Sequence, residues 1–231
     1  MITLFAVIRK YSLREQFKTD ICKQIYANGV GSIVTQSLYT LYIVGLNMIL
    51  KTFTEDAVTV LGIYYKIQSF FFIHLLGFQQ VLLPLFSYNY GAGAIRTNRQ
   101  ILKCAIMFSV GIMSVATGIF FEFPEKLIRI FAAEPDIVSI GKYAFPVISV
   151  SFIFAGLTIV ITSYLKGIAR IKTSLFIIVL RQVFLLVPLV WLFHFIGLNA
   201  VWWTFPVTEL IAGLTGVVII FILHKQDSMI Q

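Results

Sequence analysis

Apolar residues come in long unbroken runs along this chain, and short polar segments separate them. Six runs reach the length of about 20 residues that an α-helix needs to cross a bilayer. The runs are continuously apolar, whereas strands of a membrane barrel alternate between apolar and polar positions. The pattern therefore predicts six transmembrane helices, over 29–50, 60–86, 101–121, 144–165, 173–194 and 199–223.

The composition agrees with a bilayer as the solvent. Hydrophobic residues make up 59% of the chain and charged residues 12%, whereas a soluble domain carries about 25% charged residues. The net charge of +8 comes from Lys and Arg in the short separators, so the chain presents no continuous basic face for a nucleic acid. Cys22 and Cys104 are isolated, and neither a metal site nor a disulfide framework is expected.

The Lys and Arg residues also predict an orientation. The N-terminal stretch, the second and fourth connections and the C-terminal tail together hold twelve, and the opposite side holds four. Because cytoplasmic loops carry the excess of Lys and Arg, both termini are expected inside. We therefore expect a cytoplasmic N-terminal segment over 1–28, a six-helix bundle over 29–223 and a cytoplasmic tail over 224–231, in a multi-pass plasma-membrane protein.

The longest separator, 122–142, contains apolar residues at nearly helical spacing among its charges. It predicts a short interfacial helix on the outer leaflet. A structured polar loop with some buried residues is the alternative.

Four ionisable residues lie inside the predicted spans, where charge is costly and marks candidate functional positions. Arg181 and Glu209 both fall near the midplane, and we expect them to neutralise each other or to face water. The pair is either a structural bridge or a protonatable coupling site, and the lack of a second midplane carboxylate favours the bridge. Lys66 is expected to reach the outer interface, and His74 to make packing hydrogen bonds.

The first predicted span is the least apolar. Ser32, Gln36 and Thr40 are spaced four apart and share one helix face, with Tyr39 beside it. Such a face either bonds to neighbouring helices or lines a wet cavity, and its length favours the cavity. Further polar candidates for the cavity are Asn47 on the same helix and Gln68 and Gln79 on the second. Pro84, Pro146, Pro188 and Pro206 predict kinks or helix ends.

No catalytic motif stands out, so an enzyme is not expected. The chain has no His-Glu-x-x-His, paired-Asp or phosphate-loop pattern, and we expect neither a metal nor an organic cofactor.

A segment at the end of the second span carries a family resemblance. Gly77 leads through Pro84 into a run that resembles the cytoplasmic turn of the multidrug and toxic compound extrusion (MATE) family. The stretches 29–47, 127–143, 181–188 and 202–209 resemble, in order, parts of the second half of that family. The run itself is Tyr88, Asn89, Tyr90, Gly91, Ala92 and Gly93.

The resemblance implies an all-α membrane protein that forms one six-helix lobe of a twelve-helix fold. Met1–Ile8 is then expected to be the end of a preceding helix. The implied activity is secondary active export of cationic or amphipathic drugs, coupled to inward Na⁺ or H⁺, by a bacterial inner-membrane protein. The implied partners are membrane lipid, a drug-like substrate and a missing N-terminal lobe. Members of some branches carry acidic residues in the first and fourth helices of this lobe, whereas here the first span has Gln36 and no acid, and the span 144–165 has none either.

Two alternatives stay open. A flippase-superfamily transporter of lipid-linked sugars is favoured if several Arg and Lys residues line the cavity, since its substrates carry pyrophosphate. The other alternative is a non-transporting membrane fragment that needs a partner lobe.

Overall fold

The computed structural model describes residues 19–230, and it describes the side chains of 36–223 together with Tyr26, Val30, Ile33 and Lys225. The chain divides into two compact units, Met1–Ser37 and Leu38–Gln231. Every regular element in the described part is helical. In the first unit this is the start of one helix, and the bundle described below belongs to the second.

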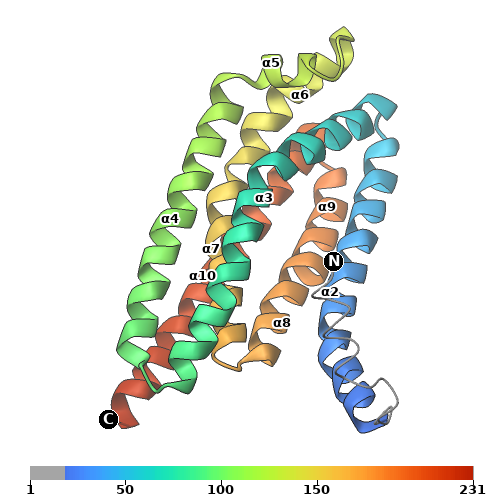
Figure 1. Cartoon of the computed structure of the whole chain (residues 1–231). Helices are drawn as coiled ribbons and strands as arrows, with labels where there is room; N and C mark the ends of the chain where they lie inside the picture. Colours follow the sequence, from blue (N-terminus) through green and yellow to red (C-terminus); the bar gives the residue numbers. More distant parts are fainter. Residues whose placement is uncertain (1–18, 231) are drawn as a thin grey trace, which may run out of the picture. The chain divides into compact units, whose positions relative to one another are not determined.

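The helices follow one another with short connections (Figure 1). In the described part of the chain, four helices are long and apolar enough to cross a bilayer, and the bent pair α6–α7 makes a fifth when it is counted as one span. The first predicted span, 29–50, lies within α2, so the helices match the predicted runs in order. The elements are α2 (Thr19–Lys51), α3 (Glu55–Gly91), α4 (Ile95–Glu122), α5 (Pro124–Arg129), α6 (Pro135–Ser149), α7 (Ser151–Gly167), α8 (Ile171–Val179), the π-helix η1 (Leu180–Leu186), α9 (Val187–His194) and α10 (Leu198–Ile230).

Several helices are longer than the apolar runs that predict them. The helix α2 begins at Thr19, before the predicted start at 29, and α10 continues to Ile230, into the predicted tail. The apolar run marks only the part of a helix suited to hydrocarbon, whereas backbone hydrogen bonding continues into polar flanks.

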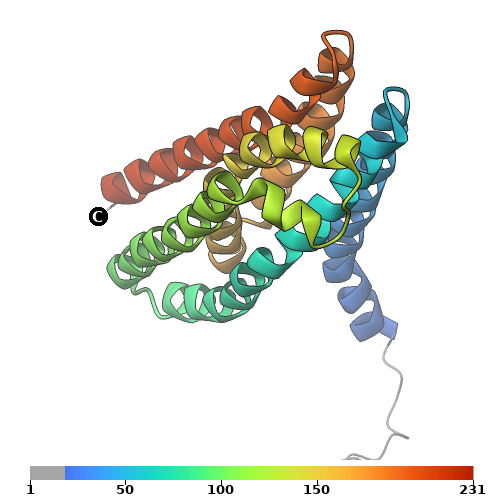
Figure 2. The ribbon, with the colours of Figure 1, turned by 90° about the horizontal axis from the view of Figure 1, so that it is seen from above.

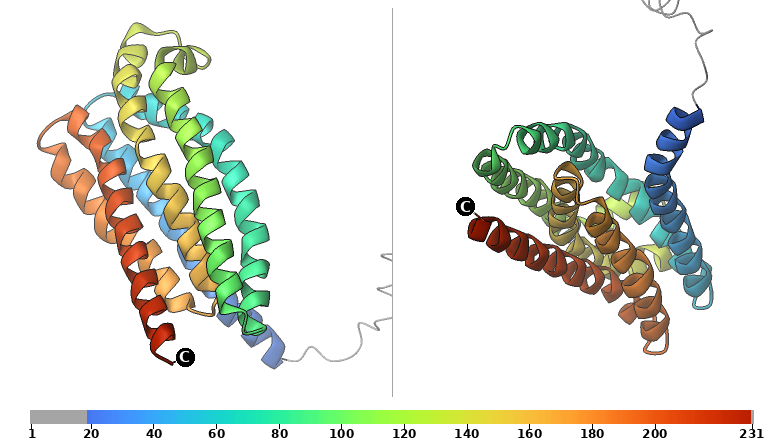
Figure 3. Two further views of the ribbon diagram at one scale, coloured as in Figure 1. Left: turned by 90° about the vertical axis from the view of Figure 1, so that its left-hand side faces the viewer. Right: turned by 90° about the horizontal axis from the view of Figure 1, so that it is seen from below.

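The helix α7 lies at the centre of the second unit. Figure 2 and the left panel of Figure 3 show α7 between α4 and α10, and it also packs against α3. Twelve of its 17 residues are buried and the other five are half-buried. Thr158, Thr162 and Ser163 donate their hydroxyl hydrogens to carbonyls of α7 itself, over 2.7 to 2.9 Å. These hydroxyls therefore need no partner from another helix.

The prediction of one interfacial helix over 122–142 needs correction. The short helix α5 ends at Arg129, and Pro135 already begins α6, whose residues Ile137 and Val138 are buried. Glu134 is extended and Pro135 occupies the first turn, a position where its missing N–H costs nothing. The second half of the separator is therefore the beginning of a span.

Ion pairs connect α5 to α6. Glu125 bonds to Arg129 at 2.9 Å and pairs with Lys142 at 3.8 Å. The hydrogen bond from Arg129 lowers the pKa of the Glu125 carboxyl below its usual range. The pair with Lys142 joins α5 to α6. Because both ion pairs are exposed, they contribute little to the free energy of unfolding.

The span α6–α7 bends by 40°. The break follows Pro146, as the sequence predicts for a proline that cannot donate a backbone hydrogen bond. The carbonyl of Ser149 at the break accepts a hydrogen bond of 2.9 Å from the Thr117 hydroxyl on α4. A neighbouring helix thus supplies the hydrogen bond that this carbonyl lacks at the break, as lipid requires.

Glycines let α7 approach its neighbours closely. A methyl group at Gly167 lies only 2.4 Å from Cβ of Phe86 on α3, which side-chain rotation cannot move away. A methyl group at Gly111 on α4 meets no neighbour within 4 Å.

We expect Gly167→Ala to destabilise the bundle by about 1–3 kcal/mol, because α3 and α7 must separate. The matched control Gly111→Ala should leave the stability unchanged or raise it slightly, since Ala is the better helix former. The apparent unfolding free energy, measured by SDS titration of the purified protein, distinguishes the two. Equal stability of both variants would contradict the close packing at Gly167.

Candidate functional site

The predicted contact between Arg181 and Glu209 is present. Nη1 of Arg181 lies 3.2 Å from Oε1 and 3.3 Å from Oε2 of Glu209. The two side chains are 23% and 15% exposed, so both are largely removed from solvent. Arg181 lies ten residues from the start of α8 and Glu209 eleven from the start of α10, which is about 15 Å along each helix. That depth is near the middle of a bilayer about 30 Å thick.

A π-helix carries the arginine. The element η1 interrupts the α8–α9 span over Leu180–Leu186, two residues before Pro188. A proline ring clashes with the carbonyl four residues earlier, and the wider π turn relieves this crowding. Arg181 therefore lies on the part of its span that differs most from regular helix. Such π-helical segments occur often at functional sites.

Four tyrosines, here called the tyrosine cluster, lie on α2 and α3. Tyr39 and Tyr42 on α2 have ring centroids 5.1 Å apart, and Tyr64 and Tyr65 on α3 have centroids 5.3 Å apart. Tyr42 and Tyr65 interact electrostatically with Arg181 and lie beside each other.

Tyr64 interacts electrostatically with Glu209 and is fully buried, with its ring close to Phe152 and Phe205. Tyr39 is exposed and Tyr42 is half-buried, whereas Tyr64 is buried. Sequence reasoning singled out Tyr39 but missed the other three. Tyrosine is a frequent packing residue, so only the spacing of Tyr39 and Tyr42 hinted at a shared helix face.

Other buried polar atoms lie on the same two elements as the ion pair. Oε1 of Gln182 and the hydroxyls of Thr204 and Thr208 are buried without a hydrogen-bond partner among the described residues. Gln182 follows Arg181 in η1, and Thr208 precedes Glu209 in α10. Polar side chains are thus concentrated on the stretches of η1 and α10 that carry the charges.

The predicted polar stripe of α2 is described in part. Gln36, Tyr39 and Thr40 are exposed and Asn47 is half-buried, whereas the Ser32 side chain lies outside the described residues. On α3, Gln68 and Gln79 are half-buried. Among the described side chains, no hydrogen bond joins Tyr39, Asn47, Gln68 or Gln79 to the ion pair.

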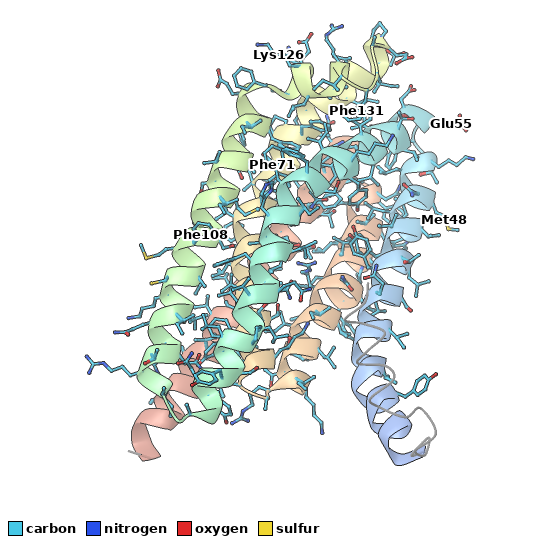
Figure 4. All side chains as sticks on the ribbon, viewed as in Figure 1. Met48, Glu55, Phe71, Phe108, Lys126 and Phe131 are labelled. Atoms are coloured by element: carbon cyan, nitrogen blue, oxygen red, sulfur yellow. The ribbon has the colours of Figure 1, made fainter. Side chains whose placement is uncertain are left out.

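The two remaining ionisable residues lie on α3 but outside this site. Nζ of Lys66 lies 5.7 Å from the ring centroid of Phe131, in the connection between α5 and α6. Figure 4 shows Phe131 at the same end of the unit as Glu55 and Lys126, the end predicted to face outward. Nδ1 of His74 lies 3.1 Å from the Phe70 carbonyl of its own helix, and the side chain is exposed. Among the described residues, neither side chain forms a hydrogen bond or ion pair with Arg181 or Glu209.

The Tyr-Asn-Tyr-Gly-Ala run forms the end of α3 and the turn into α4. Asn89 donates to the Leu85 carbonyl at 2.8 Å, and the Ala94 amide donates back to the Asn89 carbonyl at 2.9 Å. Gly93 has φ +69°, a conformation that glycine adopts without strain, whereas Gly91 ends the helix. Pro84 lies inside α3, one turn before the exposed Tyr88, and Tyr90 and Ala92 are also exposed.

The structure is a bundle of apolar helices with a charged pair deep inside it. This combination defines an integral membrane protein whose interior holds polar groups. A family model, MatE, matches residues 32–192. The chain therefore belongs to the MatE family, as the resemblance of its turn segment predicted.

Curated relatives cover nearly the whole chain. It is 24% identical over 207 residues to the multidrug export protein MepA of Staphylococcus saprophyticus, a match covering 90% of this chain and 46% of the relative. It is 22% identical over 209 residues to MepA of Staphylococcus aureus, with the same coverage. The chain thus spans about half the length of the curated relatives it matches.

Solved structures share the fold. The Vibrio cholerae MATE transporter VcmN, in its bent form, has a TM-score of 0.81 at 20% identity, covering 94% of this chain and 51% of that one. A Pyrococcus furiosus transporter of the MOP superfamily, described as having a binding pocket of reverse polarity, has a TM-score of 0.80 at 17% identity, covering 93% and 51%. The chain therefore has the fold of one lobe of a MATE-type transporter.

We expect Arg181→Gln to destabilise the protein by about 3 kcal/mol or more, because it leaves the Glu209 carboxylate buried without its partner. The double variant Arg181→Gln/Glu209→Gln should recover most of this loss, since no charge is then left unpaired. A double-mutant cycle of unfolding free energies measures the coupling. Additive effects of the two substitutions would show that the pair contributes no interaction energy.

Proposed function

We propose that the chain acts as the C-terminal lobe of a secondary active multidrug exporter, which exchanges cationic or amphipathic drugs for inward Na⁺ or H⁺. The MatE match over 32–192 carries this proposal. The curated relatives named as multidrug export proteins support it. Because the chain spans about half their length, we propose that an N-terminal lobe completes the transporter.

The polar face of α2 supplies this lobe's side of the substrate cavity in our proposal. Gln36, Tyr39 and Thr40 are exposed within a predicted span, where exposure to lipid is unfavourable for a polar side chain. A cavity shared with the other lobe would place them against water and substrate instead. Rocking of the two lobes around that cavity would then give alternating access.

We assign the Arg181–Glu209 pair a structural role in the transport cycle. The two charges compensate each other, and the pair joins η1 to α10 within one lobe. The coupling carboxylate is then expected in the other lobe, since the first span and the span 144–165 carry no acid here, whereas some branches of the family have acids in these helices. The protein would reside in a bacterial inner membrane with both termini inside, contacting lipid, the drug and the other lobe.

The lipid-linked-sugar flippase receives less support. A pyrophosphate-bearing substrate needs several cations along its path. Here Lys66 lies at the outer end of α3 beside Phe131, and Arg181 is paired with Glu209. Between Lys66 and Arg181, only Arg181 therefore lies deep within the described spans, and Arg181 already has Glu209 as its carboxylate partner.

We expect Gln36→Leu to reduce ethidium efflux about tenfold in an efflux-deficient bacterial strain, since the loss of a hydrogen bond in a substrate site costs about 1 kcal/mol or more. The control Gln100→Leu changes an exposed glutamine at the start of α4 and should leave efflux unchanged. Efflux is followed by fluorescence, with the first lobe co-expressed and with Na⁺ or a protonophore added. An efflux rate that changes neither with the Na⁺ gradient nor with the protonophore would contradict ion coupling.

A further inference from the structure

Six basic side chains lie at the end of the second unit that is predicted to face the cytoplasm. Figure 1 shows the α3–α4 turn and the start of α8 at this end, opposite α5. The sequence has no Asp or Glu over 57–121 or 137–208, so the segments that carry these six residues supply no carboxylate. We call the six the inner basic patch, and they are Arg96, Arg99, Lys103, Lys166, Arg170 and Lys172.

One residue of α3 joins the two halves of the inner basic patch. The side-chain amide of Asn98 on α4 donates to the Phe86 carbonyl at 3.2 Å. Gly167 on α7 packs so closely against Phe86 that a methyl group at this glycine would collide with it. Arg99 follows Asn98 and Lys166 precedes Gly167 in the chain. Basic residues of α4 and α7 are therefore held next to the same contact.

The turn from α7 to α8 adds the rest of the patch. The Arg170 amide donates to the Leu165 carbonyl at 2.8 Å, and the Ser174 hydroxyl donates to the Thr162 carbonyl at 3.1 Å. These hydrogen bonds fix the start of α8, which carries Lys172, against the end of α7. Correct insertion into a membrane requires only a sufficient number of Lys and Arg near the ends of the spans. It does not require that they be fixed around one packed junction.

The helix starts at this end differ from the start of α3 at the opposite end. Thr54 caps α3, and Glu55 and Asp56 lie in its first turn, where the positive end of the helix dipole favours acids. Neither α4 nor α8 has a side-chain cap or an acid in its first turn. Their first turns carry Arg96 and Lys172 instead. Both helix starts therefore place basic side chains where the dipole is already positive, and an external anion would stabilise this arrangement.

Exposed apolar side chains continue from the patch toward the middle of the spans. Met107 on α4 lies one turn beyond Lys103, and Phe176 on α8 lies one turn beyond Lys172, so each pair shares a helix face. Both apolar side chains are exposed, as is Phe108 next to Met107. A basic group followed by exposed apolar surface matches a ligand with a phosphate followed by acyl chains.

We propose that the inner basic patch binds the phosphate group of an anionic phospholipid of the cytoplasmic leaflet, with the acyl chains against Met107, Phe108 and Phe176. Arg96 and Arg170 offer planar guanidinium groups for bidentate hydrogen bonds to phosphate oxygens, and the lysines add positive charge. The adjoining apolar surface favours a lipid over free phosphate. The inference rests on the predicted orientation with both termini inside, and it does not depend on drug export.

Native mass spectrometry of the full chain in a non-ionic detergent tests the site. The probes are dioleoyl-phosphatidylglycerol and dioleoyl-phosphatidylcholine, which share their acyl chains and differ in net charge. We expect phosphatidylglycerol to bind about tenfold more tightly, since each nearby Lys or Arg adds attraction to an anionic headgroup. Arg96→Gln/Lys103→Gln and Arg170→Gln/Lys172→Gln should each remove most of this preference, and the charge-retaining Arg96→Lys/Lys103→Arg should keep it.

The matched control Lys51→Gln/Lys126→Gln removes two exposed positive charges from the opposite end and should keep the full preference. Equal binding of the two lipids by the unchanged chain, or a preference that both inner variants retain, would overturn the site. A preference that the control also loses would show a response to net charge alone and overturn it as well. Displacement of phosphatidylglycerol by an equal concentration of glycerol 1-phosphate would assign the patch to free phosphate and overturn the lipid assignment. Each measurement is made without transport, so its failure leaves the export proposal to be decided by ethidium efflux.

Discussion

The close packing around α7 is the constraint on which the bundle depends. Lipid is as apolar as the helices, so burial alone does not hold helices together in a bilayer, and close contact must supply the attraction. Gly156 and Gly167 bring α7 against α4 and α3, within distances that a methyl group would violate. The hydroxyls of α7 bond to its own carbonyls, which leaves its surface compact and free of unmet polar groups.

Departures from regular helix occur where this packing protects them. The break at Val150 is adjacent to Thr117, which bonds to the carbonyl of Ser149. The π-helix η1 packs against α10 and delivers Arg181 to Glu209. In both places another helix supplies the polar partner that lipid cannot. The charged pair is therefore a product of the packed bundle, since neither residue would be stable at that depth on an isolated helix.

The site combines a compensated charge pair on η1 and α10 with tyrosines on α2 and α3. Glu209 neutralises Arg181 at a separation of 3.2 Å. The tyrosine cluster adds polar atoms with little charge, together with flat apolar surface. The chain belongs to a family whose curated members include multidrug export proteins.

The sequence by itself determined the membrane class, the order of the spans, the Arg181–Glu209 partnership and the family. Continuous apolar runs, the rarity of buried charge and the Tyr-Asn-Tyr-Gly-Ala turn are local or pairwise signals, and they can be read along the chain. The tertiary structure alone decided that α7 is central and that 135–142 begins a span rather than completing an interfacial helix. Those features depend on which helix faces which neighbour. A membrane span that is apolar on every side carries little periodic signal for that choice, so the packing of small residues settles it.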